Sequence, residues 1–93
     1  MEIENVLSSK LRMKILKLIA QLGELNTSDV ARRLKVNYKT ANDHLKLLEA
    51  EGILQRKTFG RISLYRFSER SPKAKAIQSL IELWQQQDNE KPR

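Results

Sequence analysis

The chain lacks cysteine and any long hydrophobic run, and its 93 residues include only one histidine, His44. The absence of cysteine excludes a disulfide framework and thiolate metal sites, and it fits the cytoplasm. No apolar run approaches the roughly 20 residues that a membrane span requires. The N-terminal segment MEIENVLSSK has no basic stretch followed by a long apolar core. We therefore expect a cytoplasmic protein with neither an export signal nor a membrane segment.

The residue combinations that enzymes use are missing as well. The sequence has no glycine-rich phosphate loop and no evident pair of acids in a segment that would form a cleft. Its single histidine falls on the apolar side of a predicted helix, so nucleophilic and general-base chemistry lack their residues. One imidazole also cannot build a metal site of histidines and carboxylates. We expect no enzymatic activity, no cofactor and no metal.

The chain does contain an uneven distribution of positive charge. Of the formal net charge of +7, residues 31–66 contribute +6, with nine Lys or Arg against three Asp or Glu. A local excess of basic groups is typical of a surface that meets phosphates. On charge alone, a solvated surface rich in Lys and Arg explains the pattern equally well.

Helical periodicity marks the first half of the chain. From Ser9 to Gly23, apolar residues recur at spacings of three and four, which predicts an amphipathic helix capped by Ser8 or Ser9. After a short extended piece at residues 24–26, Thr27 is the expected N-cap of a second, short helix.

A third helix should begin after the N-cap Asn37 and end at Gly52, where a glycine suits the left-handed terminal residue. After Gly52 the pattern changes from helical to alternating. The segments ILQRKTF and RISLYRF follow, separated by Gly60, and their β-branched and alternating residues predict a hairpin. Ser71 and Pro72 open a last helix, whose apolar stripe consists of Ala74, Ile77, Leu80, Ile81 and Trp84.

The third predicted helix carries polar residues that core packing does not require. Its apolar side consists of Ala41, His44, Leu45 and Leu48. Its opposite side consists of Lys39, Asn42, Asp43 and Lys46. Asn42 could pair with adenine, and Asp43 could accept a hydrogen bond from cytosine. Tyr38 lies at the helix start, where it can stack or reach a phosphate. These residues alone favour an ordinary solvated face, but two short helices joined by a tight turn describe a helix-turn-helix.

A specific motif spans the third helix and the residues after it. It reads Thr, a small residue, two variable residues and His-Leu-Lys-X-Leu, followed by Gly and two apolar residues, and it is formed by Thr40, Ala41, His44, Leu45, Lys46, Leu48, Gly52, Ile53 and Leu54. With SSKLRMKILKLIAQLGELNTSDVARRL before it and GRISLYRF after it, this motif resembles winged helix-turn-helix regulators, most closely the arsenical-resistance repressor (ArsR) family. The resembling segments cover most of residues 8–67. The resemblance is more specific for the fold than for the subfamily.

The resemblance implies a mainly α fold with a small β-hairpin wing and an additional C-terminal dimerisation helix. The helix from Tyr38 would be the recognition helix, and the hairpin around Gly60 would be the wing beside the flanking groove. The implied DNA-binding residues are Asn37, Tyr38, Lys39, Thr40, Asn42, Asp43, Lys46, Arg56, Lys57 and Arg61. Phe59, beside the wing turn, either wedges against sugar or base or packs back on the hairpin.

The chain departs from the family pattern in two places. Metal-sensing members carry a Cys pair in an E-L-C-X-C-D segment, where residues 24–29 here read ELNTSD, so metal sensing is not expected there. Asp43 stands where relatives often have Arg, and an acid facing DNA is costly unless it meets cytosine or pairs with Lys39 or Lys46. His44 is expected to be a half-buried structural residue rather than a ligand or pH switch.

The resulting hypothesis is a single domain over residues 1–93, with a DNA-binding core at 8–70 and a dimerisation helix at 71–88. We expect a homodimer that binds double-stranded DNA sequence-specifically and acts as a transcriptional repressor. The expected dimer interface consists of Ile77, Leu80, Ile81 and Trp84, because so small a domain leaves their stripe uncovered. The alternative is that this helix folds back on its own domain. The alternative functions are a chromatin-like architectural DNA-binding protein and a winged-helix module that binds protein.

Overall fold

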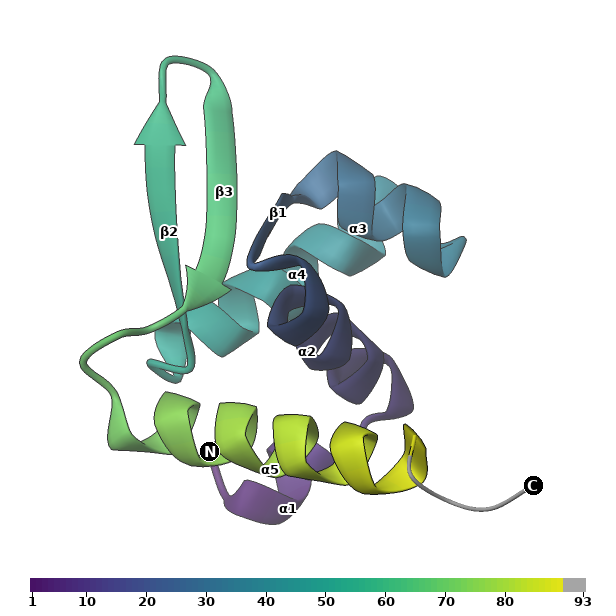
Figure 1. Cartoon of the computed structure of the whole chain (residues 1–93). Helices are drawn as coiled ribbons and strands as arrows, with labels where there is room; N and C mark the ends of the chain where they lie inside the picture. The colour runs from purple at the N-terminus through teal and green to yellow at the C-terminus, as the bar shows by residue number, and fades with distance from the viewer. Residues whose placement is uncertain (90–93) are drawn as a thin grey trace.

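The structure, a computed structural model, describes residues 1–89, which form five helices and one three-stranded antiparallel sheet (Figure 1). In chain order the elements are α1 (Ile3–Leu7), α2 (Lys10–Leu22), β1 (Glu24–Asn26), α3 (Thr27–Leu34), α4 (Tyr38–Ala50), β2 (Leu54–Phe59), β3 (Ile62–Phe67) and α5 (Pro72–Asn89). The predicted winged helix-turn-helix with an additional C-terminal helix is confirmed. Within the described range, no helix combines the length and the hydropathy needed to cross a membrane.

Side-chain caps fix where the helices begin. Asn37 caps α4 as predicted, and of the two candidates Ser8 and Ser9 it is Ser9 that caps α2. Each side-chain oxygen accepts a hydrogen bond from the backbone N–H three residues later, at 2.7 Å for Asn37 and 3.2 Å for Ser9. The predicted cap at Thr27 is wrong by one residue. Asn26 is the cap, accepting from the backbone N–H of Asp29 at 2.8 Å, while Thr27 begins α3 and is buried. Asn and Thr are both common capping residues and are adjacent here, so residue type alone does not decide which of them is the cap.

β2 and β3 form the predicted hairpin, and β1 adds a third strand in the order β1-β3-β2. The hairpin register runs from Leu54 opposite Phe67 to Phe59 opposite Ile62. Between the strands, Gly60 has a φ of 59°, a left-handed value that glycine adopts without steric cost. The extended piece at residues 24–26 was expected, but its pairing with β3 was not, because that pairing joins distant parts of the sequence.

One apolar core joins the helices to the base of the sheet. The largest of its almost fully buried side chains are Ile15, Leu16, Ile19, Val30, Leu45, Leu48, Ile53, Leu54 and Tyr65. In Figure 1, α5 runs along the side of the molecule opposite to the hairpin tip, with α1 next to it. Gln21 of α2 donates a hydrogen bond to Gln85 of α5 at 3.0 Å. The sequence did not predict α1, which adds Val6 to the core.

Candidate nucleic-acid interface

The orientation of α4 is set by its apolar side, where Ala41, Leu45 and Leu48 are fully buried. The residues assigned to DNA therefore lie on or beside the opposite side. Those that are exposed include Asn37, Tyr38, Lys39, Asp43 and Lys46, and those that are half-buried are Thr40 and Asn42. Tyr38 has 57% of its surface exposed, at the start of the helix. The N-terminal half of α4 thus presents a polar, mixed-charge surface to solvent.

Asp43, the acid on this surface, is paired with a cation of its own helix. Lys39 Nζ donates a hydrogen bond to Asp43 Oδ2 at 2.8 Å, one helical turn away. This hydrogen bond lowers the pKa of Asp43 and raises the pKa of Lys39. Both side chains are exposed, so the pair adds little to stability. Its effect is electrostatic: Asp43 stays ionised as a hydrogen-bond acceptor, and its charge is offset by Lys39, one of the two lysines predicted as partners.

The wing is tied to α4 at its base and exposed toward its tip. Arg56 Nε lies 3.5 Å from Glu49 Oε2 of α4. Tyr65, opposite Arg56 in the register, is buried; burial raises its pKa, and the Glu49 carboxylate adds to the rise. Lys57 and Arg61 are exposed, and neither takes part in an ion pair with residues 1–89. Their charges are therefore available to an anionic partner.

A hollow of about 220 Å³ joins the wing to the starts of α3 and α4. It is lined by Asn26, Thr27, Ser28, Tyr38, Arg61, Ile62 and Ser63. The start of α3 carries backbone N–H groups without helical partners, and such a helix terminus favours anions. Sequence reasoning assigned Tyr38 and Arg61 to DNA and missed Ser28. The N-terminal position of Ser28 in a predicted helix was the signal that could have included it.

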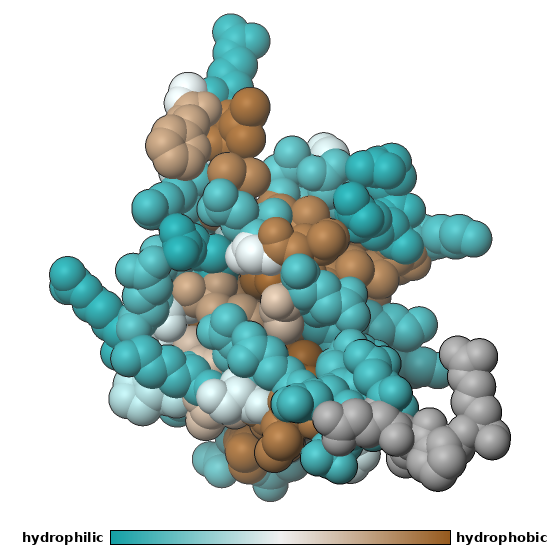
Figure 2. Space-filling model, in the orientation of Figure 1, coloured by the Kyte–Doolittle hydropathy of each residue, from teal (hydrophilic) through white to brown (hydrophobic). Residues whose placement is uncertain are grey.

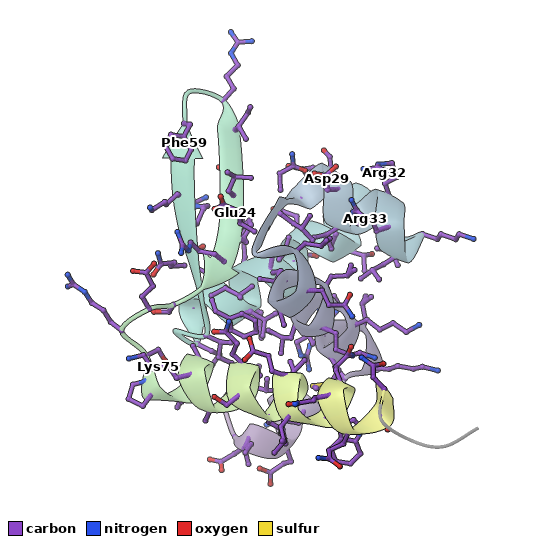
Figure 3. All side chains as sticks on the ribbon, viewed as in Figure 1. Glu24, Asp29, Arg32, Arg33, Phe59 and Lys75 are labelled. Atoms are coloured by element: carbon purple, nitrogen blue, oxygen red, sulfur yellow. The ribbon has the colours of Figure 1, made fainter. Side chains whose placement is uncertain are left out.

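The turn between α3 and α4 adds further basic groups. Lys35 has a left-handed backbone, with a φ of 58°, and its N–H bonds to carbonyl groups of the preceding turn. Arg32, Arg33 and Lys35 are all exposed, and Arg32 pairs with Asp29 at 2.9 Å. Figure 3 shows Asp29, Arg32 and Arg33 along α3, on the part of the molecule away from α5. The basic surface of the helix-turn-helix is thus remote from the C-terminal helix.

His44 lies between α4 and α2 and is half-buried, as predicted. Its Nδ1 is 3.2 Å from Nη1 of Arg12, which also donates to the backbone carbonyl of Asn5. Burial lowers the pKa of His44, and the Arg12 guanidinium lowers it further, against a smaller opposite effect of Asp43. A neutral imidazole can accept the hydrogen bond from Arg12. His44 therefore links α4 to α2, and Arg12 continues the link to α1.

The apolar stripe of α5 divides into a buried and an exposed part. Ala74 and Ile81 are 0% and 5% exposed, and Ile77 is half-buried. Leu80 and Trp84 are 48% and 66% exposed. The sequence placed all of the last four in a dimer interface, but Ile81 has almost no surface left for a second copy, because its own core covers it. The alternative that the helix folds back on its own domain thus describes Ala74 and Ile81, whereas a dimer interface at Leu80 and Trp84 stays a prediction.

Leu83 joins the exposed part of the stripe, with 57% of its surface exposed. Leu83 was not included in the predicted stripe. A groove of about 330 Å³ lies next to Leu80 and Trp84, between α2 and α5. This groove is lined by Met13, Lys17, Leu80, Ile81, Trp84, Gln85 and Asp88. The exposed face of α5 thus combines projecting apolar side chains with a recess.

Metal-binding side chains are not clustered in the part of the chain that the structure describes: there, no group of three or more His, Cys, Asp or Glu residues could hold a metal ion. The absence of a metal remains a prediction.

The fold and this surface define the class of winged helix-turn-helix DNA-binding proteins. The model of the family "Bacterial regulatory protein, arsR family" matches residues 9–56, slightly more than half of the chain. The chain belongs to this family, whose members are DNA-binding transcription regulators. A search of curated proteins found no match.

Solved structures give the same fold. The chain is similar to HlyU from Vibrio cholerae, with a TM-score of 0.73 and 23% identity over 88% of this chain and 83% of that one. A homodimeric winged helix-turn-helix DNA-binding domain from Mycobacterium bovis has a TM-score of 0.71 and 26% identity, over 96% and 77% of the two chains. The transcriptional repressor PagR of Bacillus anthracis has a TM-score of 0.70 and 22% identity, over 86% and 85%.

Proposed function

We propose that the protein is a homodimeric, sequence-specific transcriptional repressor that binds double-stranded DNA. The observation that carries the proposal is the hollow shared by α3, α4 and the wing. Ser28, Tyr38 and Arg61 come from three elements and line one recess. A phosphate backbone can pass through such a recess, between a major groove entered by α4 and a minor groove beside the wing. Membership of a family of DNA-binding regulators supports this reading.

In the proposed complex, different residues read the bases and bind the phosphates. Asn42 pairs with adenine, and the carboxylate of Asp43, which is hydrogen-bonded to Lys39, accepts from a cytosine amino group. Phosphates are contacted by Asn37, Tyr38, Thr40, Lys46, Arg56, Lys57 and Arg61. Arg56 contributes less than Lys57, because Glu49 already offsets its charge. Specificity therefore depends on α4, and most of the affinity on the basic residues around it.

The proposed dimer uses the exposed face of α5. Leu80, Leu83 and Trp84 form an apolar surface that solvent does not favour, and the adjacent groove offers a recess for the partner's side chains. The similar Mycobacterium bovis domain is homodimeric. A two-fold dimer would place two copies of α4 in successive major grooves of a roughly palindromic site. In this arrangement residues 8–70 bind DNA and residues 71–88 pair the copies.

Repression is the proposed sign of regulation. Two proteins of similar structure are transcriptional repressors: PagR of Bacillus anthracis and the antimony-specific AntR. A dimer seated on its site would act by blocking access to the DNA. We propose no catalytic role and no cofactor.

Selection of bound fragments from genomic DNA, followed by titration of salt, tests the proposal. We expect enrichment of one roughly palindromic sequence. We also expect the logarithm of affinity to fall linearly with the logarithm of salt concentration, by about 0.9 for each phosphate contact. Steep salt dependence without an enriched sequence would indicate the architectural alternative. A flat salt response would indicate a protein-binding module and overturn the proposal.

A further inference from the structure

The tip of the wing carries an exposed apolar pair that phosphate binding does not explain. Phe59 and Ile62 are opposite each other in the register and flank the Gly60 turn. Although they are neighbours, 60% of Phe59 and 55% of Ile62 remain exposed. Figure 2 shows this hydrophobic surface at the end of the hairpin, and Figure 3 places Phe59 far from the helices. More than half of each side chain is therefore open to solvent, although Ile62 also borders the hollow at the starts of α3 and α4.

The hairpin positions this pair well beyond the body of the protein. Its base is anchored, since Leu54 and Phe67 are almost fully buried. The register then continues for five more pairs to Phe59 and Ile62, which at roughly 3.3 Å per residue is a reach of about 16 Å. A two-residue turn with glycine in its first position closes the hairpin tightly, as in a type II′ turn. The apolar side chains are thus at the leading end of a narrow, anchored projection.

The charges around the pair favour a nucleic acid over a protein as its partner. Residues 54–67 contain four basic residues and no acid. Lys57 lies two residues before Phe59, and Arg61 is in the turn itself. Two side chains also fall far short of the roughly 800 Å² that each partner buries in a stable protein interface. Cations bordering a small apolar tip match a groove in which phosphates border the apolar faces of sugars and bases.

We propose that the wing tip inserts Phe59 and Ile62 into the minor groove beside the sequence read by α4, where they partly unstack a base step and bend the duplex. This inference rests on the proposed DNA-binding function. The minor groove is only about 6 Å wide, so a two-stranded ribbon enters it by widening it. Apolar wedges of Phe or Ile are known to kink DNA by roughly 20–90°. Flexible pyrimidine–purine steps at the flank would then favour binding without a base-specific contact.

The test compares wild-type protein with Phe59→Thr/Ile62→Thr on a duplex of about 30 base pairs that carries the selected sequence. Fluorophores on the two ends report bending, and 2-aminopurine placed in the flanks reports unstacking. Threonine retains the strand propensity of the replaced residues, so the hairpin should persist. We expect the wild type to bend the duplex and raise the 2-aminopurine signal at a flank. The variant should lose both effects and bind roughly tenfold more weakly.

Matched variants separate the wedge from phosphate binding and from general loss of apolar surface. Lys57→Ala should keep the bend while reducing the salt slope by about 0.9, whereas the threonine variant should keep the slope. Leu22→Thr removes another exposed apolar side chain, 47% exposed at the end of α2, and should behave as wild type. Phe59→Leu should retain most of the bend, because leucine also wedges.

The outcomes distinguish this inference from the function on which it rests. Equal bending by wild type and the threonine variant, or a straight duplex with both, would overturn the wedge. Salt-dependent binding that prefers the selected sequence would still uphold the proposed function. No binding of the wild type to any duplex would overturn both. Should the double variant melt earlier by circular dichroism, the single change Phe59→Thr applies the same criteria.

Discussion

α4 and α5 are both amphipathic helices on one core, yet their exposed sides carry opposite chemistry. On α4, the ion pair of Lys39 and Asp43 lies in solvent. On α5, the side chains exposed to solvent include Leu80, Leu83 and Trp84. The buried side of each helix fixes its place in the fold, and the exposed side has no packing role within the chain. The two helices therefore differ in their exposed side chains: those of α4 are polar and charged, which suits DNA, and those of α5 are apolar, which suits another apolar surface.

The largest expected effect concerns the exposed side of α5. Leu80→Glu/Trp84→Glu should give a folded monomer, because both residues are exposed and charge on an apolar interface opposes association. Affinity for a palindromic site should fall roughly a hundredfold or more, since the two half-sites are no longer bound together. Sedimentation equilibrium and fluorescence anisotropy measure the two effects. Leu22→Glu is the control and should remain dimeric. A wild type with the mass of one chain at micromolar concentration contradicts the dimer.

The buried side of α5 should respond differently, which sharpens the comparison. Ile81→Asp places a charge where 5% of the side chain is exposed, so it should destabilise the fold itself. We expect a loss of several kcal/mol in the free energy of unfolding, measured by urea denaturation. Unchanged stability with a lost dimer would mean that Ile81 faces a second copy after all.

On α4, the next largest effect should separate base reading from charge. Asn42→Ala should reduce discrimination at one base pair by roughly 1–3 kcal/mol. Lys46→Ala should weaken binding to all sequences alike and lower the salt slope by about 0.9. Competition binding with single-base variants of the selected site measures both. If Asn42→Ala leaves the sequence preference unchanged, the reading face of α4 has been assigned wrongly.

A smaller effect is expected from the acid of α4. Asp43→Asn removes the partner of Lys39, so affinity for unrelated duplexes should rise severalfold as positive charge is released toward phosphate. The free energy of unfolding should change by less than about 0.5 kcal/mol, because the pair is exposed. Asp29→Asn, which breaks the comparable exposed pair with Arg32, is the matched control for stability. Weaker binding to every duplex after Asp43→Asn would contradict this reading.

The smallest effect should be a dependence of stability on pH through His44. Its pKa is lower in the folded protein than in the unfolded chain, so the unfolded chain binds more protons between the two values. Its contribution to stability is therefore complete above the unfolded pKa of about 6.5 and is lost as pH falls toward the folded value. His44→Asn, whose side-chain oxygen can still accept from Arg12, should lose less stability between neutral and mildly acidic pH. Equal losses in thermal melts of both proteins would refute this.

The sequence alone determined the features that depend on neighbouring residues. Asn37 could be recognised as a cap, and the cap of α2 narrowed to Ser8 or Ser9, because a capping side chain accepts its hydrogen bond from the N–H three residues later. Gly60 marked the hairpin turn, because a tight turn needs a residue that adopts a positive φ without steric cost. Helical spacing likewise limited the partner of Asp43 to Lys39 or Lys46, since residues three or four apart are adjacent on a helix, and the structure has Lys39. Local geometry sufficed for each of these features.

Only the tertiary structure decided the features that join distant segments. One is the pairing of β1 with β3. Another is the packing of Val6, which belongs to a helix too short to show periodicity. A third is the recess that brings Ser28 close to Arg61, and all three depend on the path of the whole chain. The stripe of α5 is the clearest case. Its sequence shows one apolar face, but the line between buried Ile81 and exposed Trp84 depends on where α2 crosses it. Periodicity tells which residues share a side of a helix, whereas exposure depends on what lies against that side.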